Sequence, residues 1–352
     1  MDTLTPTDAS AAGRRTVLGP VLLLTLIGAA LVLACLLSIA LGAASISPGQ
    51  VIGALTGQPE SAQVDNIVWS ARGPRTALGL AVGAALGLSG ALMQALTRNP
   101  LADPGLLGVS AGAAFAIVVA VAWLGVRTLF GSIWFALAGA LIASVVVYAL
   151  GRLGRSGLTP VKLALAGVAV TALLSSITSA IVLTDPEALN RYRFWSAGSL
   201  ADQNGEVVLG ILPLLAVGAA LAFACAPALN SLALGDDVAA ALGRRLGLVR
   251  FQGVLAIMLL TGTAVAAVGP LVFVGLVVPH VARALAQAAG IGPDHRWLLP
   301  LSALLAPCLL LAADIAGRLV ARPVEIQAGV IIAFIGGPFF IAMVRRRRLA
   351  EV

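Results

Sequence analysis

The most constraining feature of this 352-residue sequence is a series of apolar runs, most of them about 20 residues long. A helix of that length crosses the hydrocarbon core of a bilayer, which is about 30 Å thick. Hydrophobic residues make up 60% of the chain and charged residues only 11%, against roughly 25% charge in soluble domains. The sequence therefore predicts an all-α polytopic membrane protein with about ten transmembrane helices. The runs cover residues 17–41, 76–97, 107–125, 132–150, 162–183, 207–227, 252–268, 271–284, 298–316 and 326–344.

Little of the chain remains outside these runs. We expect residues 1–16 to form a cytoplasmic N-terminal tail, residues 17–344 a ten-helix membrane domain, and residues 345–352 a basic cytoplasmic tail. The loops are too short for a nucleotide-binding fold or a water-exposed catalytic domain. Any energy-requiring process must therefore draw on a partner or an ion gradient.

The basic residues indicate how the chain is oriented. With both termini in the cytoplasm, 15 of the 22 basic residues lie on the cytoplasmic side and 7 outside, as the positive-inside rule requires. The net charge of +7 thus reflects membrane topology. We expect a lipid bilayer and no nucleic acid as the environment of this chain.

His280 and Asp314 lie inside apolar runs, where charge is costly and often functional. Each also has a structural interpretation. Asp314 precedes Arg318 by one helical turn, so the two side chains can form an ion pair. His280 follows Pro279 and can bond a carbonyl that the proline leaves free. The sequence has no chain of intramembrane carboxylates, which disfavours an ion-coupled secondary carrier.

No residue pattern indicates an enzyme. The sequence lacks a nucleophile elbow, a His-Glu-x-x-His zinc helix and a Gly-x-x-x-x-Gly-Lys phosphate loop, and it holds two histidines. Its three cysteines, Cys35, Cys225 and Cys308, are isolated within apolar runs and have no metal-ligand spacing. We therefore predict no catalytic residue, no metal site and no cofactor bound by this chain.

Two loops are more elaborate than connectors. The outside segment 184–206 mixes aromatic and charged residues, which indicates a short helix at the membrane surface. The inside segment 228–250 predicts two short helices, of which the second begins at Asp236 and Asp237. Gly243 and Gly247 would allow that segment to turn.

The inside segment 98–113 is rich in turn and capping residues. Pro100 and Pro104 should end one helix, and Gly108 should allow the next helix to pack closely. This segment and others closely resemble the FecCD family of ATP-binding-cassette (ABC) importer permeases over residues 17–345. The matching motifs are Arg72-Gly-Pro-Arg75, Asn99-Pro-Leu-Ala-Asp-Pro-Gly-Leu-Leu-Gly-Val-Ser110, Trp195 with Gly198-Ser-Leu200, Leu242-Gly243, Gly275-Leu-Val-Val-Pro-His280, Asp294-His-Arg296, Ala313-Asp314 and Gly336-Gly-Pro-Phe-Phe340.

The resemblance implies a type II importer subunit, similar to the cobalamin importer permease, in the bacterial cytoplasmic (inner) membrane. Such a subunit dimerises with a second permease around a central pathway. Two cytoplasmic ATPase subunits bind ATP and Mg and carry out hydrolysis, and one extracytoplasmic substrate-binding protein delivers the cargo. We expect a ferric siderophore as cargo, with cobalamin or haem as the alternative, and an ion-coupled secondary carrier as the alternative from another class.

The resemblance also implies roles for particular residues. Arg72, Arg75 and Arg318, with Arg322 as a helper, would dock the binding protein; alternatively, they only anchor helices and neutralise Asp314. The predicted gate is formed by Trp195, Gly198 and Ser199, although aromatic residues at a membrane surface are commonly interface anchors. Contacts with the ATPase are implied for Asp236, Asp237, Leu242, Gly243, Arg244, Arg245, Leu246 and Gly247. Structural motif positions are Asn99, Pro100, Asp103, Pro104, Gly105, Gly108, Pro279 and His280.

Overall fold

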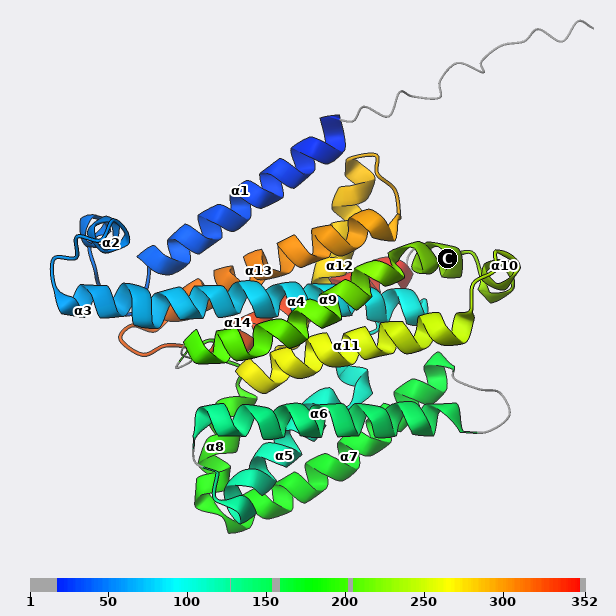
Figure 1. Ribbon diagram of the computed structural model, residues 1–352, viewed down its shortest axis with the longest axis horizontal. Helices are drawn as coiled ribbons and strands as arrows, with labels where there is room; N and C mark the ends of the chain where they lie inside the picture. Colours follow the sequence, from blue (N-terminus) through cyan, green and yellow to red (C-terminus); the bar gives the residue numbers. More distant parts are fainter. Residues whose placement is uncertain (1–17, 127, 154–158, 202–204, 349–352) are drawn as a thin grey trace, which may run out of the picture.

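The computed structural model describes residues 18–126, 128–153, 159–201 and 205–348, and it contains only helices and connecting loops over these residues (Figure 1). Each of the ten apolar runs forms a helix, although the predicted tail at 1–16 and residues 349–352 lie outside the described part. The helices are α1 (Leu18–Ala40), α4 (Gly73–Thr97), α5 (Val109–Leu124), α6 (Leu129–Arg152), α7 (Pro160–Thr184), α9 (Gly205–Ala233), α11 (Leu246–Val268), α12 (Val274–Ala288), α13 (His295–Val320) and α14 (Ala328–Arg348).

Eight of the described helices are long and apolar enough to cross a membrane. The helices α5 and α12 are apolar but shorter, with 16 and 15 residues. The prediction of an all-α membrane protein is thus confirmed.

The connecting segments carry further short elements. These are α2 (Pro48–Leu55), α3 (Ala62–Asp65), the π-helical η1 (Asn66–Arg72), the 3₁₀-helical η2 (Pro104–Leu107), α8 (Pro186–Ser196) and α10 (Asp236–Ala241). Helix α8 confirms the short helix expected in segment 184–206. The expectation of two short helices in segment 228–250 is wrong, because α9 continues to Ala233 and only α10 is separate.

The second spanning helix begins earlier than the sequence predicts. The prediction started it at residue 76, but α3, η1 and α4 form a continuous helical segment from Ala62 to Thr97. Polar residues such as Asp65, Asn66 and Arg72 lower the hydropathy of its first turns. Those turns remain helical because Val64, Val68 and Arg72 are buried against neighbouring segments.

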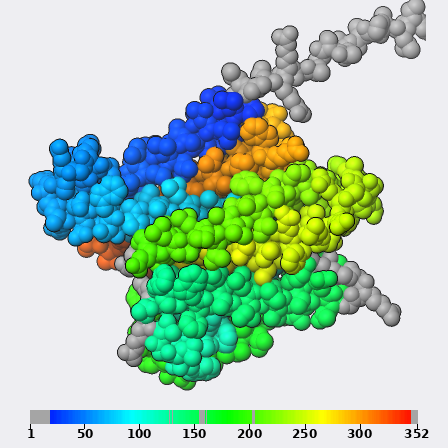
Figure 2. All heavy atoms as spheres, viewed as in Figure 1, coloured from blue at the N-terminus to red at the C-terminus, as the bar shows by residue number. Residues whose placement is uncertain are grey.

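Helix α4 lies at the centre of the bundle, where it contacts α9, α11, α12 and α13. In Figure 1 the helices α9 and α11 lie over one side of it, and α5, α6 and α7 form a separate layer at the bottom of the view. Helix α1 packs on α13 along the outside of the bundle, as the space-filling view in Figure 2 also shows. This arrangement leaves α1 and α7 largely exposed, as expected for lipid-facing helices.

Glycine permits the closest helix contacts. A Cβ atom on Gly90 of α4 would overlap the backbone of Gly275 of α12, and one on Gly112 of α5 would overlap the Gly139 carbonyl of α6. Membrane helices associate through such small-residue contacts because lipid supplies little hydrophobic driving force. The expected close packing after segment 98–108 is thereby confirmed.

The bundle has two distinct ends. The α8 end carries α2, α3, α8 and the first residues of α14, and the α10 end carries α10 and the last residues of α4 (Figure 1). By the predicted topology, the α8 end faces outward and the α10 end faces the cytoplasm.

Candidate functional site

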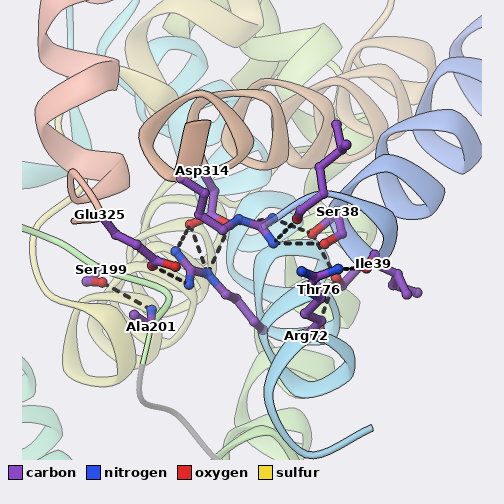
Figure 3. Close-up of polar contacts among 11 residues, drawn as sticks. Ser38, Ile39, Arg72, Thr76, Ser199, Ala201, Asp314 and Glu325 are labelled. Atoms are coloured by element: carbon purple, nitrogen blue, oxygen red, sulfur yellow. Dashed lines mark hydrogen bonds and ion pairs between the residues drawn. The ribbon is translucent and has the colours of Figure 1, made fainter. Parts of the chain in front are cut away.

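Six charged residues gather at the α8 end, and Figure 3 shows Arg72, Asp314 and Glu325 among them. We call them the arginine cluster; its members are Arg72, Arg75, Asp314, Arg318, Arg322 and Glu325. They come from η1, α4, α13 and the loop before α14. All four arginines that the resemblance assigns to docking are therefore brought together, with two carboxylates among them.

Three of these arginines cap the C-terminal end of α1. Arg72 donates from Nη1 to the carbonyls of Ile39 and Ala40, both at 2.8 Å, and from Nη2 to that of Ala44 at 2.7 Å. Arg318 and Arg322 donate to further carbonyls of residues 38–42, each at 2.8 Å. The last carbonyls of a helix lack intrahelical partners and carry partial negative charge, so guanidinium groups stabilise them.

Asp314 joins two of the arginines in a buried ion pair. Its carboxylate lies 2.8 Å from Nη2 of Arg75 and 2.9 Å from Nη2 of Arg318, and its side chain is only 1% exposed. Arg75 also donates from Nη1 to Oε2 of Glu325 at 2.7 Å. The predicted pairing of Asp314 with Arg318 is confirmed, and Arg75 is an additional partner. Asp314 thus has a structural reason for its place inside an apolar helix.

The arginine cluster borders a cavity of ≈ 1060 Å³ at the α8 end. Arg72, Arg75, Arg318 and Glu325 line one part of it, and residues of α8 and the following segment line another. Three of the predicted docking residues, Arg72, Arg75 and Arg318, therefore share one cavity with the predicted gate residues Trp195 and Ser199. Its α8-side lining includes Glu187, Arg191, Phe194, Trp195 and Ser199.

The segment at the C-terminal end of α8, residues 195–199, is held to its neighbours by backbone contacts. Gly198 has a φ of +70°, and its carbonyl accepts a hydrogen bond of 2.9 Å from the N–H of Gly329 in α14. The N–H of Ser199 donates to the carbonyl of Val268, at the end of α11, at 2.8 Å. A Cβ on Gly269 would overlap the Trp195 carbonyl. Any movement of this segment must therefore involve α11 and α14.

At the α10 end, Asp236 ties the predicted coupling segment to the bundle. Its carboxylate contacts Arg98 at the end of α4, and it accepts a hydrogen bond of 2.6 Å from Arg250 of α11. Desolvation by burial acts to raise its pKa, but the hydrogen bond and charge of Arg250, together with Arg98, outweigh it and lower the pKa of Asp236. The residue predicted to contact an ATPase thus also positions α10 within this subunit.

Gly243 ends α10 in the way that the sequence suggested. It has a φ of +76°, its N–H donates to Ala240, and the N–H of Arg244 donates to Ala239. This is the Schellman arrangement, in which glycine is favoured. The turn expected at Gly247 is wrong, because Gly247 lies in the first turn of α11.

The other predicted coupling residues lie on the surface of the α10 end. Asp237, Leu242, Arg244 and Arg245 are exposed, whereas Leu246 is half-buried. Leu242 is 60% exposed, and Val238, one turn earlier, is 44% exposed. Apolar and basic groups are therefore presented together on this end.

The motif loop 99–108 is built from local caps. The Asn99 side chain accepts a hydrogen bond from the N–H of Leu101 at 2.9 Å, and Asp103 accepts one from the N–H of Gly105 at 2.7 Å, with Pro104 opening η2. Burial raises the pKa of the Asp103 carboxyl, although the Gly105 N–H acts against this shift. Gly108, with a φ of +71°, joins η2 to α5. Pro100, in the turn after α4, lies outside both helices, as the sequence predicts.

A polar network surrounds Pro279 in α12. A proline lacks the N–H that would bond the carbonyl four residues earlier, and here Gln94 of α4 donates to that carbonyl of Gly275 at 3.3 Å. Gln94 also accepts a hydrogen bond of 2.5 Å from Arg283. The His280 Nδ1 lies 3.2 Å from the Leu276 carbonyl. His280 therefore has a backbone partner, but the prediction that this partner is the carbonyl left free by Pro279 is wrong, because Gln94 takes that carbonyl.

The sequence reasoning missed two residues of these networks. Glu325 is an acidic residue in the loop between the last two spans, and Gln94 is a polar residue in an apolar helix. The position of Gln94 is itself a signal, because an amide buried in a membrane helix needs hydrogen-bond partners. The predicted site residues themselves lie at the α8 end, at the α10 end, on the loop that joins α4 to α5 and, for Pro279 and His280, within α12.

Comparisons with known proteins agree with this architecture. The sequence profile of the FecCD transport family matches residues 30–346. The chain is 47% identical to the ferric enterobactin transport system permease protein of Escherichia coli K12, over 97% of this chain and 98% of that protein. It is 40% identical to the cobalamin import system permease protein of Halobacterium salinarum, over 83% of this chain and 76% of that protein.

A solved structure is similar in fold. It is an inward-facing metal-chelate type ABC transporter, which superposes with a TM-score of 0.80 at 27% identity and covers 93% of this chain and 99% of that one. The relatives are membrane permease subunits, whose transport is driven by separate ATPase subunits. The chain belongs to the FecCD transport family and is a membrane permease of an ABC importer.

Proposed function

We propose that this chain is the permease through which ferric siderophores are imported across the bacterial cytoplasmic membrane. The observation that carries the proposal is its identity of 47% with a ferric enterobactin permease over nearly the whole of both chains. A cobalamin permease is also similar, at 40% identity, so cobalamin and haem are the competing cargoes within the family. The cargo iron is substrate, and no cofactor is assigned to this chain.

The proposed topology has ten spans and both termini in the cytoplasm. The shorter helices α5 and α12 are then the third and eighth spans, held by close glycine contacts within the bundle. The distribution of 15 basic residues inside and 7 outside supports this orientation. It directs the α8 end outward and the α10 end to the cytoplasm.

The α8 end would receive an external substrate-binding protein. Guanidinium groups suit this role because they contact carboxylates in a bidentate manner and steer association over a distance. Arg72 and Arg318 are 5% and 1% exposed and already bonded, so they would act mainly through their positive field. Arg75, which lines the cavity, and Arg322, which is exposed, are better placed for direct contact.

The α10 end would receive the ATPase subunits, which bind ATP and Mg. Exposed Val238 and Leu242 offer apolar contacts, and Arg244 and Arg245 offer charged ones. Asp236 fixes α10 to α4 and α11 through Arg98 and Arg250. A force applied to α10 would therefore be transmitted to two helices of the bundle rather than absorbed in a flexible loop.

A second permease subunit, identical or related, would complete the pathway. The segment 195–199 is the proposed gate, since it joins α8 to α11 and α14 through backbone hydrogen bonds. Its displacement would move those helices as well.

The test is uptake into proteoliposomes that contain this chain with its candidate ATPase and binding protein. We compare a labelled ferric siderophore with labelled cobalamin and haem. Uptake of the siderophore only when ATP and binding protein are both present is the expected result. Uptake of cobalamin or haem instead under those conditions would show that the proposed cargo is wrong. Uptake driven by an ion gradient without ATP would overturn the importer mechanism.

A further inference from the structure

The two carboxylates of the arginine cluster are held very differently (Figure 3). Asp314 contacts both Arg75 and Arg318, and its side chain is 1% exposed. Glu325 contacts Nη1 of Arg75 alone within the cluster, and its side chain is 32% exposed. Water and an approaching molecule can therefore reach Glu325, whereas Asp314 is enclosed.

The charge of the arginine cluster is not balanced. The cluster holds four arginines and two carboxylates, so it carries two more positive than negative charges. A carboxylate from outside would be attracted to it. Arg75 offers that carboxylate a place, because Nε and Nη2 bind the enclosed Asp314 while Nη1 binds Glu325, whose side chain is 32% exposed. Both Arg75 and Glu325 line the cavity.

Glu325 also lies at a mechanically connected point of the chain. The N–H of the next residue, Ile326, donates to the carbonyl of Gly317 in α13 at 3.0 Å. Four residues after Glu325, the N–H of Gly329 in α14 donates to Gly198. A shift of Glu325 therefore acts on the first turn of α14 and on segment 195–199.

We propose that Glu325 is a displaceable internal carboxylate, which occupies Arg75 in the unbound permease and is replaced there by an acidic side chain of the binding protein. This inference rests on the proposed function of the α8 end. Exchange of one carboxylate for another leaves Arg75 paired throughout, so no buried charge is left unpaired at any stage. The exchange of carboxylates also links docking of the binding protein to release of the loop that contains Glu325 and leads into α14.

The experiment measures the affinity of the assembled permease–ATPase complex in lipid nanodiscs for the binding protein encoded beside the permease gene. Glu325→Gln removes the internal competitor and is expected to lower the Kd about two- to fivefold, the range for a partly exposed ion pair. Glu325→Asp keeps the charge but shortens the side chain by one methylene, so a smaller decrease is expected. The Glu325→Asp measurement still tests the proposal if the Glu325→Gln variant fails to assemble.

Glu60→Gln is the matched control. Glu60 is exposed at the same end, between α2 and α3, and its substitution changes the net charge equally. An unchanged Kd for both Glu325 variants, or an equal decrease for Glu60→Gln, would overturn the displacement mechanism alone. If the wild-type complex does not bind the protein at low or physiological salt, the proposed docking function fails, and this inference fails with it.

Discussion

Asp314→Asn tests whether the buried ion pairs of the arginine cluster hold the α8 end together. The substitution keeps the size of the side chain and removes its negative charge. Arg75 would retain Glu325, but Arg318 would lose its carboxylate while remaining 1% exposed. A buried guanidinium without a counter-charge is the costly product of this change.

The expected magnitude follows from burial. Asp314 and Arg318 have side chains that are 1% and 2% exposed, so the range of about 0–1 kcal/mol for surface pairs does not apply. Removing one partner of a buried pair costs about 3–5 kcal/mol. At roughly 2 °C for each kcal/mol in a chain of this size, we expect the melting temperature to fall by about 6–10 °C.

The assay is thermal unfolding of the purified permease in detergent, followed by fluorescence-detected size exclusion. Asp237→Asn, at an exposed acidic residue of α10, is the matched control and should leave the melting temperature nearly unchanged. The double variant Asp314→Leu with Arg318→Met removes both charges and should be more stable than Asp314→Asn. The reasoning about unpaired charge is wrong if Asp314→Asn has the same melting temperature as Asp237→Asn. It is also wrong if the double variant is less stable than Asp314→Asn.

Three further predictions concern the helix contacts and the α10 end. Gly90→Ala should reduce the yield of folded protein severely, because its Cβ would overlap the Gly275 backbone, whereas Gly28→Ala in open space should not; expression and size exclusion compare them. Gly243→Val should abolish ATP-driven uptake while the subunit stays folded, since a φ of +76° costs a side chain about 1–2 kcal/mol; Gly290→Val, which carries the same strain at a φ of +70° in open space between α12 and α13, should retain uptake. Asp236 has a lowered pKa, so the stability that its ion pairs give to α10 is fully present above the unfolded pKa of about 3.9. That stability is lost only as the pH falls further, through the folded pKa. The protection factors of the α10 amides, which correct for the intrinsic pH dependence of exchange, should therefore be constant from pH 5 to 8 in wild type and lower in Asp236→Asn.

Hydropathy was sufficient to locate all ten apolar helices, because long apolar segments have few alternatives in a membrane. Hydropathy failed at residues 62–75, because polar side chains lower the hydropathy of this segment although it is helical. Helix α2 was also missed, although Ser47 and Gln50 form a capping box and Pro48 follows the cap. That signal is local and was available in the sequence.

The sequence identified residues of the site but did not predict how these residues are arranged in space. The arginines were identified through the family resemblance, but no sequence pattern showed that Arg72 and Arg318 cap α1 from a distance of more than 30 residues. The role of Gln94 likewise depends on α12 packing against α4, so that its amide meets the carbonyl freed by Pro279. Contacts between segments far apart in the chain cannot be read from local periodicity.

Helix α4 connects the two ends physically. It carries Arg75 at its first turn, and Arg98 is its C-cap, about 35 Å away at 1.5 Å per residue. Between them, Gly83 and Gly87 hold α4 against α13 and Gly90 holds it against α12, so closely that a Cβ at any of them would overlap a neighbouring backbone. The middle of α4, residues 83–90, cannot bend without separating these contacts. Any coupling between Arg75 and the Arg98–Asp236 pair must therefore displace α4 as a rigid body together with α12 and α13.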